Sequence, residues 1–501
     1  MTTERPERRA RTPATVIPLI SIDRRARPPL HQQVYDSLRS AITVGRLSGG
    51  QQVPSTRDLS KDLGVSRIPV LSAYSQLIAE GYLETRAGAG TYVCKFLPEQ
   101  STSCQSPTVS DQSLRSSFRR ASKRAEALPA MITPPWVNAR GAFSLGQLAL
   151  DAFPLTLWTR LVSRTAKNAK ISSLTYGQPQ GRYDLRRAIA SYLGSARAVR
   201  CNPEQIIIVS GSQQALQVAA WSLLDPGDSI WMEDPAYRLA RRAFELAGAK
   251  LVPVPVDEEG LQVEQGRHKD PYARAAFVTP SHQLPLGVTM SASRRLQLLE
   301  WAQQHGSWII EDDYDSEFRY ESRPIASLQG LDTDSRVIYV GTFSKVLLPS
   351  IRVGYMVVPE DMVDRFLAVR QTMDICPADL QQAVLAEFID EGHFARHIRQ
   401  MRVIYGERRA ALVESLETLL GDELQLHGDE AGMHLTVSLK KPGNDREIAL
   451  RAAKQDLWLW PLSPAYQDAK PKQGFILGFG GVAASQMPKA VRLMRDVLRE
   501  G

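Results

Sequence analysis

The segment SWIIEDDYDSEFRYESRPIASLQGLDTDSRVIYVGTFSK, residues 307–345, decides the fold of the larger part of this chain. It holds two short apolar runs, residues 307–313 and 337–343, that are typical of buried strands. Similar runs recur on both sides of it, with helix-length segments between most of them: residues 205–210, 229–233, 275–280 and 353–359. Buried strands that alternate with helices predict an α/β domain built on a mostly parallel sheet with both faces covered.

Polar side chains follow several of these runs directly. Asp312 and Tyr314 lie at the end of the first run of the quoted segment, Lys345 follows the second, and Arg352 comes shortly after it. The run at 205–210 leads into SGSQQAL, which opens a helix, and a helix start with free backbone N–H groups favours a phosphate. Ligands bind at the carboxyl ends of parallel strands, so we expect these groups in one site. A lysine, a carboxylate and an arginine around a phosphate seat are what pyridoxal phosphate requires.

These residues together resemble the fold-type I pyridoxal-phosphate enzymes of the aspartate aminotransferase group, from about Tyr176 to the C-terminus. The resemblance implies that Lys345 forms the Schiff base with the cofactor and that Asp312 pairs with the pyridine nitrogen. It also implies that Tyr314 lies near the 3′-oxygen and that Tyr237, in EDPAY, stacks on the ring.

The same resemblance predicts how the phosphate is held. The matching positions are Gly211, Ser212, Gln213, Thr342 and Arg352. Tyr176, in LTYGQPQG, matches a tyrosine that reaches the phosphate of the neighbouring subunit, which implies a homodimer.

Two departures from the aminotransferase pattern weigh against a working transaminase. Where the enzymes carry N-P-x-G, with an Asn that bonds the 3′-oxygen, this chain has LPLG at residues 284–287. His282 and Gln283, just before it, could supply a replacement hydrogen bond. The C-terminal arginine that grips the substrate α-carboxylate is not visible in residues 473–478. Without a bidentate guanidinium, we expect amino-acid binding to be weaker or to use another group.

The N-terminal segment predicts a winged helix-turn-helix. Residues 29–45 place apolar side chains on one helical stripe, and Ser55 is a suitable N-cap for a second helix. Gly64 can supply the turn before a third helix capped by Ser66. Residues 81–93 then alternate as two short strands around a glycine-rich tip, which describes a wing. The third helix is the one expected in the major groove.

This segment resembles the GntR family of bacterial winged helix-turn-helix regulators through VPSTR, LGVSR and GAGTYV. The resemblance implies DNA contacts from five residues: Arg57, Ser66, Arg67, Gly88 and Gly90. An arginine at a helix N-terminus reaches phosphates or guanine edges, and the wing glycines permit close approach to the minor groove. Ile68 and Pro69 stand where the family usually has a polar pair, so the operator sequence stays open.

The motif TPSHQLP, residues 279–285, is similar to a pattern of the MocR subfamily of GntR regulators, which joins these same two modules in this order. We therefore expect a multidomain chain. Its parts are a DNA-binding domain at residues 26–95, a flexible linker at 96–140 with a short helix near 115–127, and an aminotransferase-like domain at 141–501.

The positive charge of the chain is concentrated at its front. Residues 1–95 carry a net charge of +6 and residues 96–140 carry +3, whereas residues 141–501 carry −2, for a total of +7. A basic module on a near-neutral body predicts a polyanion partner for the module. The 4 cysteines show no CxxC spacing, which argues against a zinc site or a disulfide framework. Together with the lack of a secretory signal or a membrane-length apolar run, this fits the cytoplasm.

These features leave two functions open. The first is a cytoplasmic transcription regulator that binds double-stranded DNA and responds to pyridoxal phosphate, or to an amine or amino acid that reacts at Lys345. The second is an active pyridoxal-phosphate-dependent aminotransferase with an appended DNA-binding domain. We expect no metal site, and the operator, the sign of regulation and the effector stay open.

Overall fold

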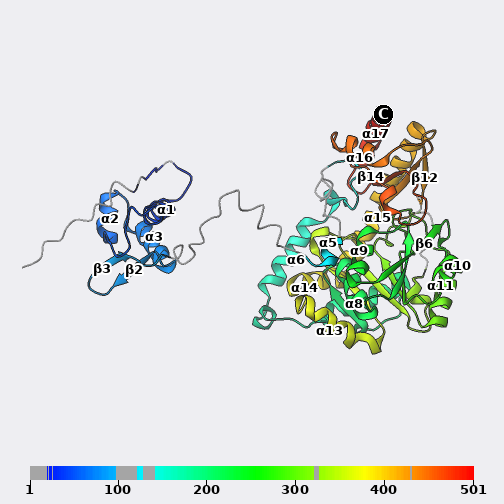
Figure 1. The fold of residues 1–501 in the computed structure, drawn as a ribbon, viewed down its shortest axis with the longest axis horizontal. Helices are drawn as coiled ribbons and strands as arrows, with labels where there is room; N and C mark the ends of the chain where they lie inside the picture. Colours follow the sequence, from blue (N-terminus) through cyan, green and yellow to red (C-terminus); the bar gives the residue numbers. More distant parts are fainter. Residues whose placement is uncertain are drawn as a thin grey trace, which may run out of the picture. The chain divides into compact units, whose positions relative to one another are not determined.

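The computed structural model describes residues 20, 22–24, 26–97, 121–127, 141–320, 326–428 and 431–500. The chain divides into two compact units, residues 1–120 and 121–501, and each is described by itself (Figure 1). Of the short helix expected near residues 115–127, the structure describes α5 (Lys123–Ala127); Cys104 and most of the expected linker lie outside the described residues. Within those ranges, no helix is both long and apolar enough to cross a membrane.

The described part of the N-terminal unit is a winged helix-turn-helix. Its helices are α1 (Leu30–Thr43), α2 (Thr56–Asp62) and α3 (Arg67–Ala79), and its strands are β1 (Gln52–Val53), β2 (Leu83–Arg86) and β3 (Gly90–Val93). The sheet has the order β1-β3-β2 with antiparallel pairs. α1 packs on α3, and fully buried side chains such as Leu38 and Leu77 fill the core. The predicted helices and wing are confirmed, whereas β1, only two residues long, was not predicted.

The two predicted helix caps differ in their hydrogen bonding. Ser55 caps α2 as expected, because its side chain accepts a hydrogen bond from the backbone N–H of Asp58. Ser66 occupies the N-cap position of α3 but makes no side-chain cap bond, so that part of the prediction is wrong. An N-cap serine bonds the N–H of the second or third helical residue, and the third residue of α3 is Pro69, which has no N–H.

The larger unit is built on an eight-stranded sheet with the order β4-β11-β10-β9-β8-β5-β6-β7. The strands are β4 (Ile206–Val209), β5 (Ser229–Asp234), β6 (Lys250–Asp257), β7 (Gly260–Leu261), β8 (Ala275–Val278), β9 (Trp308–Asp313), β10 (Val337–Thr342) and β11 (Gly354–Val357). The pairs from β10 through β9, β8 and β5 to β6 are parallel, and β11 runs antiparallel to both of its neighbours. The predicted α/β fold with a mostly parallel sheet is confirmed.

Helices cover both faces of this sheet (Figure 1). They are α6 (Leu155–Lys167), α7 (Tyr183–Arg197), α8 (Ser212–Leu223), α9 (Arg238–Ala247), α10 (Val263–Lys269), α11 (Ala292–His305), α12 (Leu328–Leu331), α13 (Val363–Asp374), α14 (Asp379–Asp390) and α15 (His393–Leu420). On one face, Ile207, Met232 and Ile310 pack in a cluster with residues of α8, α9 and α13. On the other, Trp231 and Ile309 pack against residues of α10 and α11.

A second, antiparallel sheet follows α15 and was not predicted. It comprises β12 (Leu424–His427), β13 (His434–Leu439), β14 (Trp460–Pro461) and β15 (Gly474–Gly478) in the order β12-β13-β15-β14. Helices α16 (Asp445–Ala453) and α17 (Met487–Arg499) complete this C-terminal part. β13 matters for the site described next, because it starts at His434 beside the carboxyl ends of the large sheet's strands.

Candidate cofactor and DNA-binding sites

The DNA-binding residues predicted from the sequence lie on two features of the N-terminal unit. Arg57 is in the first turn of α2, Arg67 is the first residue of α3, and both are exposed. Arg67 Nε donates to Thr56 Oγ1 over 3.2 Å, which ties the start of α3 to α2. Gly88 and Gly90 lie at the wing tip with φ of 72° and 113°. The φ of Gly90 is one that residues with a side chain rarely adopt, so that position favours glycine.

The start of α3 also exposes apolar side chains. Ile68 is 75% exposed and Leu71 is 49% exposed, on the helix expected in the major groove. Apolar side chains at such positions contact the methyl group of thymine. The sequence showed only that Ile68 replaces a polar residue; the structure adds that its side chain faces solvent.

In the larger unit, one cavity collects five of the predicted cofactor residues: Ser212, Tyr237, Asp312, Tyr314 and Lys345. They come from different elements, namely the start of α8, the loop after β5, the end of β9, the residue after β9 and the loop after β10. The other lining residues are Leu145, Gly146, Thr279, Leu284, Asp315, Met433 and His434. The cavity thus lies at the carboxyl ends of the parallel strands, where such folds bind ligands.

Lys345 projects into this cavity against a glycine. Burial lowers the pKa of its ammonium group, so the neutral, nucleophilic amine forms more readily than on a solvated lysine. A Cβ on Gly146, which has a φ of +80°, would lie 2.5 Å from Lys345 Nζ. Gly146 therefore leaves the space that the amine occupies. Its importance was not apparent from the sequence, because it lies outside the matched motifs.

Asp312 is the group whose environment fits a cofactor most directly. The side chain is buried, and its Oδ1 atom has no hydrogen-bond partner among the described residues. Burial, with the nearby charges of Asp313, Asp315 and Glu233, raises the pKa of Asp312 to about 7. A buried carboxylate oxygen without a partner is costly, so its position in this cavity fits a ligand that brings a proton, such as a pyridinium N–H.

The expected phosphate contacts gather around the start of α8. Gly211, the N-cap residue of α8, has a φ of +93°, and a Cβ there would lie 3.0 Å from Arg352 Nη2. Arg352 Nη2 donates to Ser210 O over 2.7 Å, which fixes the guanidinium beside the helix start. Thr342 is buried at the end of β10. Backbone N–H groups, the helix dipole and an arginine together fit a phosphate.

Six predicted cofactor residues do not line the cavity: Gly211, Gln213, Thr342, Arg352, Tyr176 and His282. Gln213 turns toward α9, because its Nε2 donates to Leu239 O over 3.1 Å. Tyr176 is 79% exposed, and its expected contact with a neighbouring subunit stays a prediction.

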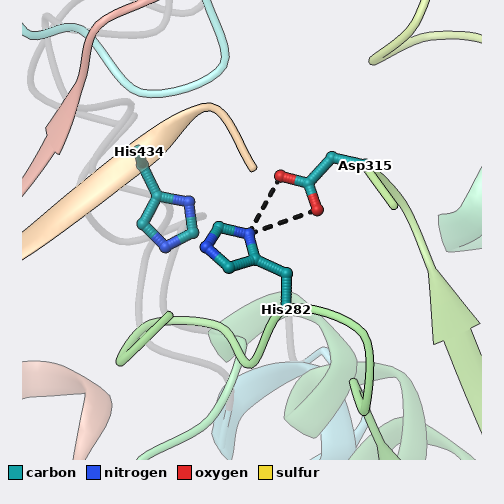
Figure 2. Close-up of side chains that lie close together, drawn as sticks. All are labelled: His282, Asp315 and His434. Atoms are coloured by element: carbon teal, nitrogen blue, oxygen red, sulfur yellow. Dashed lines mark hydrogen bonds and ion pairs between the residues drawn. The ribbon is translucent and has the colours of Figure 1, made fainter. Parts of the chain in front are cut away.

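His282, which could supply a hydrogen bond in place of the aminotransferase asparagine, belongs to a buried network of side chains. His282 Nδ1 lies 3.1 Å and 3.2 Å from the two carboxylate oxygens of Asp315, and Tyr314 Oη donates to His282 O over 2.9 Å. Gln283 does not take part, because its Nε2 donates to Glu233 and to Pro235 O. Figure 2 shows His282 between Asp315 and His434, and the two imidazole centroids are 4.4 Å apart.

Asp315 and His434 were not singled out from the sequence. Asp315 follows the predicted Asp312 and Tyr314 in the same motif, DDYD, so a close inspection of that motif could have found it. His434 comes from β13, far away in the chain, and no motif marks it. The ligand atoms of His282, Asp315 and His434 lie within 4.8 Å of one another, a spacing that also occurs at metal sites.

The fold and the site define a class of protein: a DNA-binding regulator whose larger domain has the aminotransferase fold. Residues 30–93 match the family of bacterial regulatory proteins called gntR, and residues 143–461 match aminotransferase class I and II. The chain is 40% identical to the probable rhizopine catabolism regulatory protein MocR of Rhizobium meliloti, over 95% of both chains. It is 30% identical to the pyridoxine biosynthesis transcriptional regulator PdxR of Corynebacterium glutamicum, over 89% of this chain and 91% of that one.

A solved structure gives the same picture for the larger unit. The multiple substrate aminotransferase of Thermococcus profundus superposes with a TM-score of 0.70 at 27% identity, and the match covers 77% of this chain and 98% of that chain. The chain therefore belongs to the MocR-type subfamily of GntR transcription regulators. Its aminotransferase domain implies pyridoxal phosphate as the cofactor.

Proposed function

We propose that this regulator holds pyridoxal phosphate through Lys345 and that its DNA binding responds to the cofactor or to an amine that reacts there. One observation carries the proposal: Asp312 Oδ1 is buried with no hydrogen-bond partner in the part of the chain that the structure describes, and Asp312 lines the same cavity as Lys345. When bound, the cofactor would supply an electron-accepting ring and an aldehyde for amines.

Each residue of the cavity has a distinct part in this proposal. Asp312 would accept a hydrogen bond from the protonated pyridine nitrogen, and Tyr237 would lie on the ring face. Gly211, Ser212, Thr342 and Arg352 would hold the phosphate at the start of α8. The lowered pKa of Lys345 would keep a fraction of its amine neutral, as covalent attachment to an aldehyde requires.

The homodimer is proposed from the surface around Tyr176. Three side chains here are more than three-quarters exposed, although apolar or aromatic groups of this size are usually covered: Ile171 84%, Leu174 78% and Tyr176 79%. In the proposed homodimer, the second copy would cover these three side chains. Tyr176 would then lie near the phosphate of the cofactor that the partner subunit binds. A dimer carries two DNA-binding domains, which suits an operator with two half-sites. We propose that it acts in the cytoplasm, where bacterial DNA lies.

The attachment is tested by titrating cofactor-free protein with pyridoxal phosphate and recording its near-visible absorbance. The unmodified protein should show a saturable shifted band at one cofactor per chain, and Lys345→Ala should not. Lys250→Ala, at an exposed lysine on β6, is the matched control and should behave like the unmodified protein. A band that persists in Lys345→Ala would contradict the assignment.

The competing function, an active aminotransferase, is favoured by the fold alone. Aminotransferases carry the arginine that binds the substrate α-carboxylate in the region that matches residues 473–478. In this chain, Ile476 of that region lies on β15 and is buried in a cluster with Leu286 and Leu462. A transamination assay with several amino acids and a keto acid separates the two functions. We expect turnover far below the 1–1000 per second of typical enzymes, about 1% or less, and robust turnover would favour the enzyme.

A further inference from the structure

The cavity around Lys345 has one chemically uniform wall. Apart from the groups assigned to the cofactor, its polar members are Thr279, Asp315 and His434, and its apolar members are Leu145, Leu284 and Met433. The Thr279 hydroxyl is engaged, because it donates to Glu233 Oε2 and accepts from the backbone N–H of Leu284. Asp315 and His434 both offer hydrogen-bond acceptors. Asp315 is a carboxylate whose oxygens face His282 Nδ1 and, at 3.3 Å, the backbone N–H of Met433.

The tautomer of His434 follows from its contact with a carbonyl. His434 Nε2 lies 3.2 Å from Pro285 O, and a carbonyl oxygen only accepts, so Nε2 carries the proton. Nδ1 is then a bare acceptor. Burial, followed by the charge of His282, holds the pKa of His434 well below its usual value, so the ring stays neutral. His282 does not line the cavity: its Nδ1 faces the Asp315 carboxylate, and its ring lies beside that of His434 (Figure 2).

No arginine is found among the described residues that line the cavity, and Lys345 is their one cation. The nearby guanidinium groups are held elsewhere. Arg352 bonds Ser210 O at the phosphate end, Arg197 pairs with Asp313 over 2.8 Å, and Arg319 Nη1 lies 3.4 Å from Ser281 O. A carboxylate placed against this wall would face the Asp315 carboxylate and the bare Nδ1 of His434.

We propose that the site selects primary amines that carry no carboxylate and whose far end donates a hydrogen bond, received by the acceptors of Asp315 and His434 in the cavity wall. This rests on the proposed attachment of the cofactor to Lys345. It narrows the effector from amines and amino acids in general to amines with a neutral donor such as a hydroxyl group.

The test compares three amines of equal chain length on full-length protein loaded with pyridoxal phosphate: 4-amino-1-butanol, n-butylamine and 4-aminobutyrate. Binding is measured by calorimetry. We expect 4-amino-1-butanol to bind at least tenfold more tightly than 4-aminobutyrate, with n-butylamine between them. Equal or tighter binding of 4-aminobutyrate would overturn the proposal. A protein that fails to take up the cofactor at all would refute the proposed function, which is a different result.

Two variants test whether His434 is the acceptor that favours 4-amino-1-butanol over n-butylamine. His434→Leu should remove the advantage of 4-amino-1-butanol over n-butylamine, because the acceptor is lost while the volume is largely kept. His305→Leu, at the exposed end of α11, is the matched control and should keep the advantage. An unchanged ratio in a folded His434→Leu protein would contradict the role of His434. The order of the three amines on the unmodified protein decides the main proposal even if this variant does not fold.

Discussion

Replacing Asp312 by Asn should stabilise the cofactor-free protein and weaken its hold on the cofactor. Burial, the first cause, raises the pKa of Asp312 from 3.8 to about 7. The neutral acid is therefore favoured in the folded state, and its contribution to stability is complete below pH 3.8 and is lost as the pH rises through about 7. Asparagine is neutral at every pH and escapes this loss.

The magnitude follows from the same shift. Each pKa unit corresponds to about 1.4 kcal/mol, so the ionised Asp312 costs up to about 4 kcal/mol at pH 8 and about 2 kcal/mol at pH 5.5. In the cofactor-bound protein, the charge-assisted bond to the pyridine nitrogen would be lost, at about 1.5–3 kcal/mol or roughly tenfold to a hundredfold in affinity.

The assay is thermal unfolding of cofactor-free Asp312→Asn and unmodified protein at both pH values, with cofactor affinity measured in parallel. The variant's melting temperature should exceed that of the unmodified protein by several degrees at pH 8 and by less at pH 5.5. Asp313→Asn is the matched control, and it should lower the melting temperature instead of raising it. Burial alone would raise the pKa of Asp313, but Arg197 and Tyr339 hold it below its usual value, so the variant should destabilise the fold. A pH-independent effect of Asp312→Asn, or unchanged cofactor affinity, would refute the reasoning.

Three further predictions concern the DNA-binding unit and the dimer. Arg57→Ala should weaken DNA binding on all sequences and reduce the slope of log affinity against log salt concentration by about 1. Ile68→Ala should leave that slope unchanged and relax the sequence preference at one base pair. Identical slopes for Arg57→Ala and the unmodified protein would contradict the phosphate contact of Arg57. Gly90→Ala should loosen the wing by about 1–3 kcal/mol, seen as faster amide hydrogen exchange in residues 83–93, because its φ of +113° lies outside the left-handed region that other residues adopt. Gly88→Ala, at a φ of +72° near that region and with nothing within 4 Å, should cost less, and equal effects would contradict this cause. Mixing Tyr176→Ala with Lys345→Ala chains should restore tight cofactor binding at one site of each mixed dimer; no recovery on mixing would count against a tyrosine shared between subunits.

The sequence predicted those features whose cause is local. The buried strands before Asp312 and Lys345 are continuous apolar runs, and the polar residues that follow them had to fall at one edge of a parallel sheet. Ser55 was recognisable as a cap because the N–H that it bonds is three residues away, at Asp58. Ser66 was misjudged because the position that would donate to it is Pro69, which has no N–H.

The remaining site residues depend on tertiary structure. Gly146 and His434 reach the cavity from segments far from Lys345 in sequence, and neither belongs to a motif. Asp315 could have been found in the DDYD motif, but its pairing with His282 could not, because only the folded loops bring its carboxylate within 3.2 Å of that ring. Gln213 matched a phosphate contact by position, yet its amide is bonded to Leu239 O. A motif therefore places the backbone more reliably than it places the side chain.

The central claim is that cofactor held at Lys345 governs DNA binding. The most direct measurement is the fluorescence anisotropy of a duplex that the protein itself has selected from random sequences, titrated with unmodified protein and with Lys345→Ala, each with and without pyridoxal phosphate. The account predicts that the cofactor changes the affinity of the unmodified protein severalfold and leaves that of Lys345→Ala unchanged. Equal affinities for the unmodified protein with and without cofactor, also after addition of 4-amino-1-butanol, would contradict it.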